Sequence, residues 1–326
     1  MTCISDRRNR PLVLYHAVSS YQLLEVMLHR MLVHAGARAV LVLPDFITGK
    51  YPQVRRLAAR QWFDKVVLFP YLRIPHREEA AVRADVCRAA ERLLPYAVTD
   101  FSEIYVAGAH FYFSLYLLAQ GVPFTMFEDA AGMLSRPEVL YDALRVQFPE
   151  HAEIARRHGL FDGENPLVRQ VICLKAAQRR DVSAARYRDF SVEDALERLS
   201  PAKRRRLIRF FLRRRIRTDA QAILLTQRFA SLGMMSEGQQ RRLYERLRDG
   251  ELRGIRLLIK KHPDDTLDYA AIFPDAEQIR PVFPSELLPY VFVRRPAVVY
   301  SFDSTGCANL RRHFLVKTVR RESYAE

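Results

Sequence analysis

A strand-length apolar run in the last third of the chain ends in two lysines and a histidine. Residues 255–260 are too few for a stable helix and Pro263 follows closely, so the pattern predicts a buried strand. His262 then stands at the C-terminal edge of that strand, where open α/β sheets bind their ligands. A histidine there can serve an anionic leaving group. The plainer alternative is a solvated Lys-Lys-His strand end.

Two adjacent carboxylates, Glu128 and Asp129, follow a second apolar run at residues 124–127. On an extended chain neighbouring side chains point in opposite directions, so at a turn one carboxylate can enter a cleft while the other braces the loop. A partly desolvated carboxylate can act as a general base. Gly132 permits the close backbone approach that such a turn requires. The alternative is an ordinary helix N-terminus, where the helix dipole favours acidic residues.

A hydroxyl-rich segment, residues 301–306, follows a third predicted strand. Ser304 and Thr305, together with backbone N–H groups at a helix start, form a natural phosphate cradle, although a simple helix cap before Gly306 explains them as well. The chain contains no GxGxxG, GxxxxGK[ST], HExxH or GxSxG pattern, which removes the main support for nicotinamide, P-loop, zinc-protease and serine-hydrolase functions. Its four cysteines show no CxxC spacing, so we expect a reducing compartment and no metal site.

The elements that position these residues alternate between strand and helix in two separate halves of the 326-residue chain. In the first half we predict strands at 11–16, 39–43, 66–69, 104–107 and 124–127, with helices at 21–34 and 76–94. In the second half we predict strands at 222–226, 255–260, 297–301 and 314–317, with helices at 237–248 and 284–288. This pattern predicts an α/β, GT-B-like architecture of two Rossmann-like, doubly wound domains facing a cleft. The expected divisions are an N-terminal Rossmann-like domain at 1–135, a basic helical linker at 136–219 and a C-terminal Rossmann-like domain at 220–326.

The composition is strongly basic, with 52 lysines and arginines against 37 acidic residues and a formal charge of +15. Such a balance predicts an anionic partner, which can be a nucleic acid, an acidic membrane face or a phosphorylated substrate. The positive charge concentrates between Lys203 and Arg217, where Phe210 and Phe211 recur at helical spacing. A solvated basic helix is the usual meaning of such a run, but the aromatic residues favour an anionic membrane surface over nucleic acid, for which no helix-turn-helix, RNP or zinc-finger pattern is present. We read no signal peptide at the N-terminus and no membrane span at residues 105–127, and expect a cytoplasmic protein, peripheral at the inner face of the cell membrane.

Six short segments, each at a predicted strand or helix edge, resemble in order the motifs of bacterial sialyltransferases of GT-B type. The resemblance is to the lipooligosaccharide sialyltransferases of glycosyltransferase family 52, with the bacterial polysialyltransferases as relatives. The segments are Ser19-Ser20-Tyr21-Gln22-Leu23-Leu24, Glu128-Asp129-Ala130-Ala131-Gly132, Leu224-Leu225-Thr226-Gln227, Lys261-His262-Pro263, Phe283-Pro284-Ser285-Glu286-Leu287-Leu288 and Ser304-Thr305. Three positions depart from the family pattern: Ala130 replaces a glycine, and Ser20 and Arg228 stand where proline is usual.

The resemblance implies an inverting transfer of sialic acid, or a related nonulosonate, from a CMP-sugar to a hydroxyl of a surface glycan such as lipooligosaccharide or capsule. It also implies that the domain at 1–135 is the acceptor side and that the domain at 220–326 binds the nucleotide sugar. Glu128 or Asp129 would be the base, with Glu128 preferred as the first acidic position, and His262 would stabilise or protonate the departing phosphate. The donor-binding residues would be Gln22, Gln227, Lys261, Pro263, Glu286, Ser304 and Thr305. Such a reaction needs a base and charge stabilisation but no obligatory metal or other cofactor. A homodimer is a further expectation of the resemblance.

Two other functions remain open from the sequence. The same fold can use a different donor, either another CMP-ulosonate or a UDP-sugar. Alternatively the chain is a non-catalytic module that holds membranes or nucleic acid through its arginines, a function that Ala130 and the excess of basic residues support. The binding module predicts salt-sensitive binding to polyanions and no transfer from any sugar nucleotide.

Overall fold

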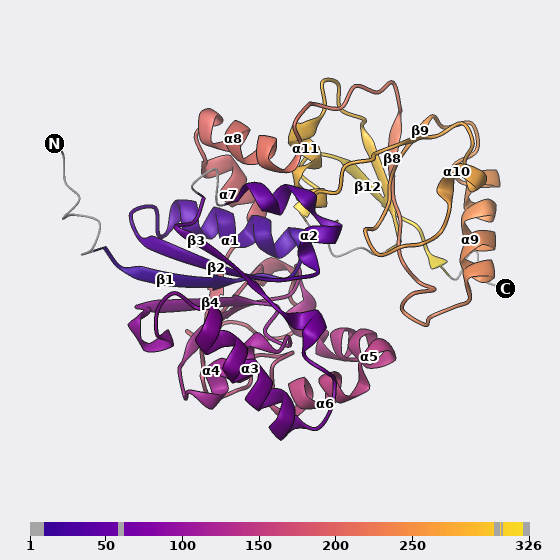
Figure 1. Cartoon of the computed structure of the whole chain (residues 1–326). Coiled ribbons are helices and arrows are strands. Elements are labelled where there is room, and N and C mark those ends of the chain that lie inside the picture. The colour runs from indigo at the N-terminus through magenta and orange to yellow at the C-terminus, as the bar shows by residue number, and fades with distance from the viewer. Residues whose placement is uncertain (1–9, 58–61, 303–306, 308, 322–326) are drawn as a thin grey trace. The chain divides into compact units, whose positions relative to one another are not determined.

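The protein is described by a computed structural model that covers residues 10–57, 62–302, 307 and 309–321. The chain divides into two compact units, residues 1–204 (unit 1) and 205–326 (unit 2) (Figure 1). Each unit is built on one parallel β-sheet.

Unit 1 contains a seven-stranded sheet in the order β3-β2-β1-β4-β5-β6-β7. The strands are β1 (Leu12–His16), β2 (Arg38–Pro44), β3 (Lys65–Phe69), β4 (Glu103–Ala107), β5 (Phe124–Phe127), β6 (Val168–Cys173) and β7 (Tyr187–Asp189). All six neighbouring pairs are parallel. The strand order reverses at β1, which lies between β2 and β4, so the carboxyl ends of β1 and β4 form the topological switch point where such sheets bind ligands.

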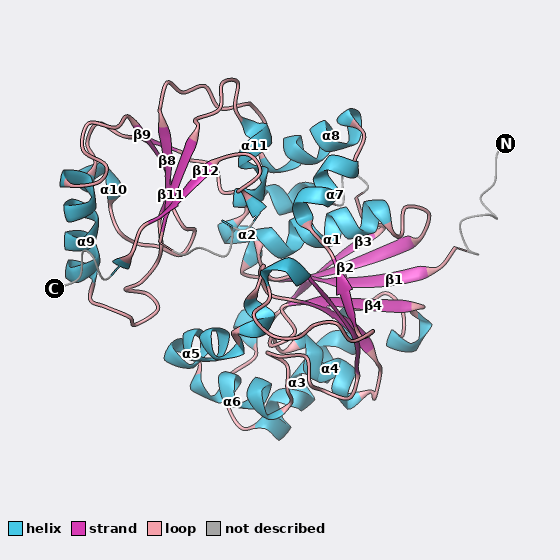
Figure 2. Cartoon of the chain, turned by 180° about the vertical axis from the view of Figure 1, so that it is seen from behind, coloured by secondary structure: helices cyan, strands magenta, loops and turns pink. Residues whose placement is uncertain are grey.

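Helices cover both faces of this sheet, with α1 and α7 on one side and α3 and α4 on the other (Figures 1 and 2). The helices of unit 1 are α1 (Ser20–Leu32), α2 (Ile47–Lys50), α3 (Glu79–Leu93), α4 (Phe113–Ala119), α5 (Pro137–Gln147), α6 (Pro149–Arg157) and α7 (Val192–Arg198). Helix α1 begins where the sequence predicts, because the Ser19 side chain accepts a hydrogen bond from the Gln22 N–H and caps the first turn.

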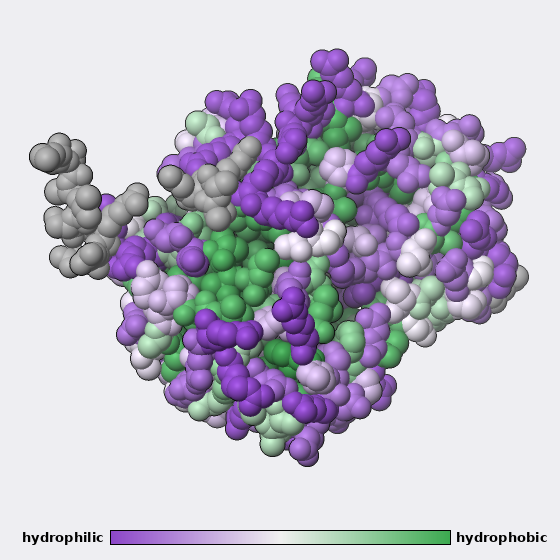
Figure 3. Space-filling model, in the orientation of Figure 1, coloured by the Kyte–Doolittle hydropathy of each residue, from purple (hydrophilic) through white to green (hydrophobic). Residues whose placement is uncertain are grey.

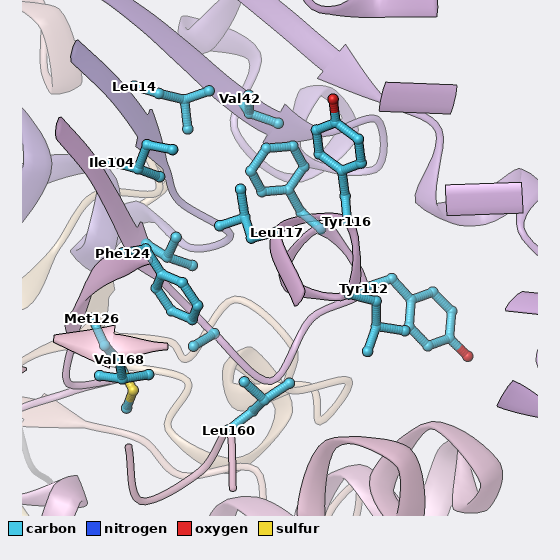
Figure 4. Close-up of a cluster of buried hydrophobic side chains, with 14 of the residues drawn as sticks. Leu14, Val42, Ile104, Tyr112, Tyr116, Leu117, Phe124, Met126, Leu160 and Val168 are labelled. Carbon is cyan, nitrogen blue, oxygen red and sulfur yellow. The ribbon is translucent and has the colours of Figure 1, made fainter. Parts of the chain in front are cut away.

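The core on the α3–α4 side consists of alternate strand residues packed against the two helices (Figure 4). Leu14, Val42 and Ile104 from three adjacent strands point toward Leu117 of α4, and Phe124 continues the layer on β5 (Figure 4). Because strand side chains alternate between faces, Val13 and Tyr15 lie on the opposite face, under α1, where both are fully buried. A sheet buried on both faces explains the almost continuous apolar runs of these strands.

The segment 136–219, expected as a helical linker between domains, instead completes the first sheet. It supplies β6 and β7, which extend the sheet beyond β5, so unit 1 continues to Arg204. The sequence pattern conceals these strands because β6 carries Arg169 and Gln170 near its start and β7 has three residues. The helical part of the expectation agrees with α5, α6, α7 and α8 (Pro201–Phe211).

Unit 2 contains a five-stranded parallel sheet in the order β10-β9-β8-β11-β12. Its elements are β8 (Ala222–Leu225), α9 (Glu237–Asp249), β9 (Leu257–Lys260), α10 (Tyr269–Ile272), β10 (Glu277–Gln278), α11 (Leu288–Val291), β11 (Val298–Ser301) and β12 (Leu315–Thr318). Helices α9 and α10 lie on one face of the sheet and α11 lies on the other (Figure 1). The α/β fold with two doubly wound halves is confirmed.

The predicted elements of the second half agree with the structure apart from one helix. The helix expected at 284–288 is a 3₁₀ turn, Ser285–Leu287, followed by the four-residue α11. Among the described residues no helix is both long and apolar enough to cross a membrane.

Candidate functional site

Glu128 follows β5 directly and anchors the loop that carries Asp129. Its side chain is 1% exposed, and both of its oxygens accept hydrogen bonds. One oxygen, Oε1, accepts the Leu174 N–H at 2.6 Å. The other, Oε2, accepts the Gly132 N–H at 3.0 Å and the Gln178 Nε2–H at 2.7 Å, with a longer contact of 3.5 Å to the Leu134 N–H. Glu128 therefore joins its own loop to the segment after β6.

Burial and hydrogen bonding act in opposite directions on Glu128. Desolvation raises the pKa of this carboxyl to about 7, while the surrounding N–H groups favour the charged form. Because every group around the carboxyl is a donor, an added proton would point at another donor, so the geometry fits a carboxylate. With its oxygens occupied in this way, Glu128 is poorly placed to take a proton from a substrate hydroxyl.

Asp129 is half-buried and differs from Glu128 in its surroundings. Its Oδ1 accepts a hydrogen bond of 2.6 Å from Nε2 of Gln22, and the oxygen of the same Gln22 amide accepts the Val18 N–H at 2.8 Å. Gln22 thus orients the Asp129 carboxylate from the first turn of α1, at the switch point of the sheet. The structure brings together these two predicted residues, which are 107 positions apart in the sequence.

Two glycines allow this arrangement. Gly132 has φ +82°, and a Cβ at this position would lie 2.8 Å from the backbone oxygen of Ala177. Gly108, with φ +71°, follows β4, and a Cβ there would lie 2.7 Å from Cγ2 of Val18 and 3.1 Å from the Gln22 side-chain oxygen. A side chain at Gly108 would therefore displace the residue that holds Asp129.

His110 is a polar neighbour that the sequence does not reveal as part of this site. Its side chain is buried, which lowers its pKa, and the charge of Asp129 raises it in part. His16, the last residue of β1, is fully buried, and its Nδ1 lies 2.8 Å from the Ala107 oxygen. Burial lowers the pKa of His16 to about 4, so it is neutral near pH 7.

His262 follows β9 in unit 2, as the sequence predicts, and its ring is oriented by its own loop. The Asp264 N–H donates to Nδ1 of His262 at 3.1 Å. Burial first, and then the charge of Arg228, lower the pKa of His262 to about 4. The imidazole is therefore neutral near pH 7, and because Nδ1 is an acceptor its single proton is on Nε2. His262 can donate a hydrogen bond to an anion, but at neutral pH it is not an acid.

A buried polar network fixes the loop around His262. Asp265 accepts hydrogen bonds from the Tyr269 hydroxyl at 2.6 Å, from Gln240 Nε2 at 3.1 Å and from the Thr226 hydroxyl at 3.3 Å. The Thr226 oxygen in turn accepts the His262 N–H at 3.0 Å. The ends of β8 and β9 are thus tied together through Thr226, which gives the histidine loop a defined geometry.

The residues near His262 that the sequence predicts to bind the sugar donor differ in their hydrogen bonds and exposure. Gln227 is held through its backbone, because its N–H donates to the Tyr244 hydroxyl at 2.8 Å. Lys261 donates from Nζ to the Leu267 oxygen at 2.7 Å, so its charge braces the loop. Pro263 is exposed at the turn after His262. Ser304 and Thr305 lie outside the described residues.

Arg228 is a second residue that sequence reasoning missed, because it appears there as a departure from a family pattern. It is half-buried, and its Nη1 lies 3.6 Å from the Asp264 carboxylate, on the residue whose N–H orients His262. Its charge also lowers the pKa of His262. A permanent cation after β8 and a neutral N–H donor after the neighbouring strand β9 make an anion-binding arrangement at the carboxyl edge of the unit 2 sheet.

Glu286 is buried in the turn before α11, next to a lysine that the sequence analysis did not single out. Burial raises the pKa of Glu286, while the charge of Lys260 lowers it in part. Burial also lowers the pKa of Lys260 to about 8, and its ammonium lies 5.1 Å from the centre of the Phe283 ring. Lys260 and the Ser301 residue at the end of β11 are both register partners of Leu225. Lys260, Leu225 and Ser301 therefore lie side by side at the carboxyl ends of their strands, and because strand side chains alternate, Lys260 lies on the opposite face of the sheet from Ile259.

Comparison with known proteins gives the fold. No protein-family model matches the sequence, and no curated protein matches it. The structure is similar to an α/β-galactoside α-2,3-sialyltransferase from the luminous marine bacterium Photobacterium phosphoreum, with a TM-score of 0.53 and 12% identity over 95% of this chain and 90% of that one. The fold is GT-B-like.

Two further structures belong to the same comparison. Arabidopsis thaliana UGT89C1, complexed with UDP-L-rhamnose, has a TM-score of 0.54 and 12% identity over 95% of this chain and 79% of that one. A UDP-N-acetylglucosamine 2-epimerase from Rickettsia bellii has a TM-score of 0.54 and 14% identity over 96% of this chain and 80% of that one. At these identities the likeness concerns the fold, and the chemistry has to be argued from the residues.

Proposed function

We propose that the protein is an inverting glycosyltransferase that moves sialic acid, or a related nonulosonate, from a CMP-sugar to a hydroxyl of a bacterial surface glycan. The observation that carries this proposal is the oriented, neutral His262 beside Arg228 at the carboxyl edge of unit 2, which suits the phosphate of a departing nucleotide. The motif resemblance supports CMP as that nucleotide.

In the proposed reaction Asp129 is the base and takes the proton of the acceptor hydroxyl as the new C–O bond forms. The bond between the anomeric carbon and the phosphate oxygen breaks, and its electron pair leaves on CMP. Arg228 stabilises the negative charge that develops there, and Nε2–H of His262 donates a hydrogen bond to it. His262 does not need to transfer its proton, because a phosphate monoester is a good leaving group when its charge is stabilised.

Glu128 has a different part in this mechanism. It holds the loop that presents Asp129, and Gln22 fixes the carboxylate orientation from the other side. The preference between the two acidic residues that the sequence suggests is thereby reversed in the proposal. Of the other donor residues, Ser304 and Thr305 are proposed to bind the phosphate and Glu286 the ribose, while Lys261 and the Gln227 backbone shape the loop.

The reaction is proposed to need no metal, because a base, an arginine and a neutral donor supply what the transfer requires. We place it in the cytoplasm, since Cys87 and Cys173 are free thiols, which fits a reducing compartment. A homodimer remains an expectation that follows from the family resemblance.

The test is a CMP-release assay with the full-length protein, CMP-sialic acid and a panel of galactose-ended acceptors, in the presence of EDTA. Release that depends on the acceptor and survives EDTA supports the proposal. Thermal stabilisation by CMP and by UDP separates the donors, because a ligand that binds the native state raises its melting temperature. Stabilisation by UDP alone would replace the CMP donor with a UDP-sugar on the same fold. If no nucleotide sugar stabilises the protein and none releases its nucleotide, the proposed glycosyltransferase function is rejected.

A further inference from the structure

Unit 2 carries an arginine-rich surface at the end of its sheet that is opposite His262. Three pairs of exposed arginines contribute to it: Arg213–Arg214, Arg294–Arg295 and Arg311–Arg312. They come from three segments that are far apart in the sequence. This set of six arginines is called the arginine face below.

Hydrogen bonds place the three segments side by side. The Ile216 N–H donates to the Val291 oxygen at 2.8 Å, and the Val293 N–H returns to the Ile216 oxygen at 2.9 Å. The Leu315 N–H donates to the Ala297 oxygen at 3.0 Å, and the Arg295 guanidinium lies 5.1 Å from the centre of the Phe314 ring. The arginine face is therefore one surface of one compact unit and not a sequence run alone.

The three segments that carry the arginine face have no acidic residue of their own. Residues 205–218, 291–298 and 309–320 contain no aspartate or glutamate. Two large apolar side chains stand among the arginines, with Val293 55% and Leu315 61% exposed. Hydrophilic residues crowd the loops beside α11, with hydrophobic patches between them (Figure 3).

The location of the arginine face leaves the candidate phosphate site accessible. The first residues of β8, β11 and β12 are register partners, Ala222, Val298 and Leu315, so the three segments lie at the amino ends of the strands. His262 follows the carboxyl end of β9. Strands of four residues separate the two edges by roughly 13 Å, at about 3.3 Å per residue. A partner can cover the arginine face without covering His262.

We infer that the arginine face docks unit 2 on an anionic phospholipid bilayer. The negative surface of a phosphatidylserine- or phosphatidylglycerol-containing leaflet attracts clustered arginines, and exposed aliphatic side chains gain from entering its interfacial layer. The combination of arginines with exposed aliphatic side chains favours lipid over nucleic acid, because Val293 and Leu315 can make no favourable contact with a charged phosphate backbone. Phe210 and Phe211 play no part in the docking, since both are buried, contrary to the membrane-facing role that their spacing suggests.

The docking surface gives the proposed reaction a location. A glycan that is extended on a lipid carrier stays at the membrane, and a basic face holds the enzyme there. This inference stands on the charge and exposure of unit 2 and does not depend on the identity of the donor.

Vesicle sedimentation tests the inference with the full chain and two matched triple variants. Arg213→Glu, Arg214→Glu and Arg294→Glu change the arginine face, and Arg242→Glu, Arg280→Glu and Arg320→Glu change exposed arginines elsewhere on unit 2 by the same net charge. Each arginine near an anionic leaflet contributes roughly fivefold in affinity, so the first variant should bind vesicles of 30% phosphatidylserine at least about 100-fold more weakly. The second variant should bind like the parent protein, and none should bind pure phosphatidylcholine.

Two further arms distinguish lipid from other polyanions. Val293→Ser with Leu315→Ser should weaken vesicle binding severalfold while leaving heparin retention unchanged, because heparin has no apolar layer. If the two charge-reversed triple variants lose vesicle affinity equally, binding depends only on the net charge of the protein, and the inference is overturned. Tighter binding to a 30-mer oligonucleotide than to the anionic vesicles at equal salt would also overturn it and assign the face to nucleic acid.

Discussion

Exchanging Glu128 and Asp129 separately for their amides should produce opposite effects on stability and on turnover. In Glu128→Gln one carboxylate oxygen becomes an NH₂ group that faces a donor. The least costly orientation keeps the oxygen on the side of Gly132 and Gln178 and loses the 2.6 Å hydrogen bond from the Leu174 N–H. Losing a buried hydrogen bond to a charged group costs about 1.5–3 kcal/mol, and relief of the desolvated charge offsets part of that, so we expect about 2 kcal/mol.

The corresponding change in melting temperature follows from the size of unit 1. At roughly 2–4 °C per kcal/mol, Glu128→Gln should melt about 4–8 °C below the parent protein. Glu128→Ala, which leaves all of the donors around it without an acceptor, should cost about 4 kcal/mol and melt lower still. Asp129→Asn should melt within about 2 °C of the parent, because its amide oxygen can still accept from Gln22 at a half-exposed position.

Thermal melts and initial rates on the same preparations provide the assay. Asp129→Asn should lose turnover by at least about a hundredfold, which is the usual value of a general base. Glu128→Gln should retain a measurable fraction of turnover at a temperature well below its melting point. The reasoning is refuted by a Glu128→Gln variant that melts normally and has no turnover, since Glu128 would then be acting on the substrate.

Three other perturbations follow from the described contacts. Three buried histidines have pKa values lowered by burial to about 4, 3 and 3: His16, His29 and His151. Their unfolded forms take up protons below about pH 6.5 while the folded forms stay neutral, so the stabilising effect is complete above pH 6.5 and is lost as the pH falls toward 4. All three histidines belong to unit 1, and the free energy of unfolding of this unit, from urea titrations, should drop by about 3–4 kcal/mol per pH unit between pH 6 and 5 because of them. Glu128, whose raised pKa acts in the opposite direction, reduces this drop by about 1 kcal/mol. A flat profile would contradict the burial of these rings. Gly132→Ala should destabilise unit 1 by about 2–3 kcal/mol, because φ +82° and the Ala177 oxygen at 2.8 Å both oppose a Cβ, and an unchanged melting temperature would show that the loop has another conformation. Arg228→Ala should reduce turnover by about 10²-fold or more with a smaller change in melting temperature, and Arg228→Lys should restore part of it; loss of melting temperature without loss of turnover would make Arg228 a structural residue.

The sequence predicts most of the fold because strands that are buried on both faces of a parallel sheet form continuous apolar runs. Residues 124–127 form β5 as predicted, and the Ser19 cap fixes the start of α1. Strand β6, which lies between β5 and β7, escapes detection because Arg169 and Gln170 interrupt its apolar pattern. The first domain is consequently longer than the periodicity indicates.

The sequence predicts which residue types lie at the strand ends of the candidate site, but it does not predict the role of each residue. Adjacent acidic residues carry no signal that tells which one is buried. That distinction arises from Leu174 and Gln178, which the fold brings from about 50 residues away to surround Glu128. For the same reason the sequence shows His262 but not its protonation state, which depends on burial and on Arg228.

The measurement that tests the account most directly is the mass of the acceptor after incubation with CMP-sialic acid, EDTA and either the parent protein or Asp129→Asn. The account predicts an acceptor heavier by one or more nonulosonate residues with the parent protein, released CMP in equal amount, and at least about a hundredfold less product with Asp129→Asn. An unchanged acceptor with the parent protein, or full product with Asp129→Asn, would contradict the proposed transfer or its base.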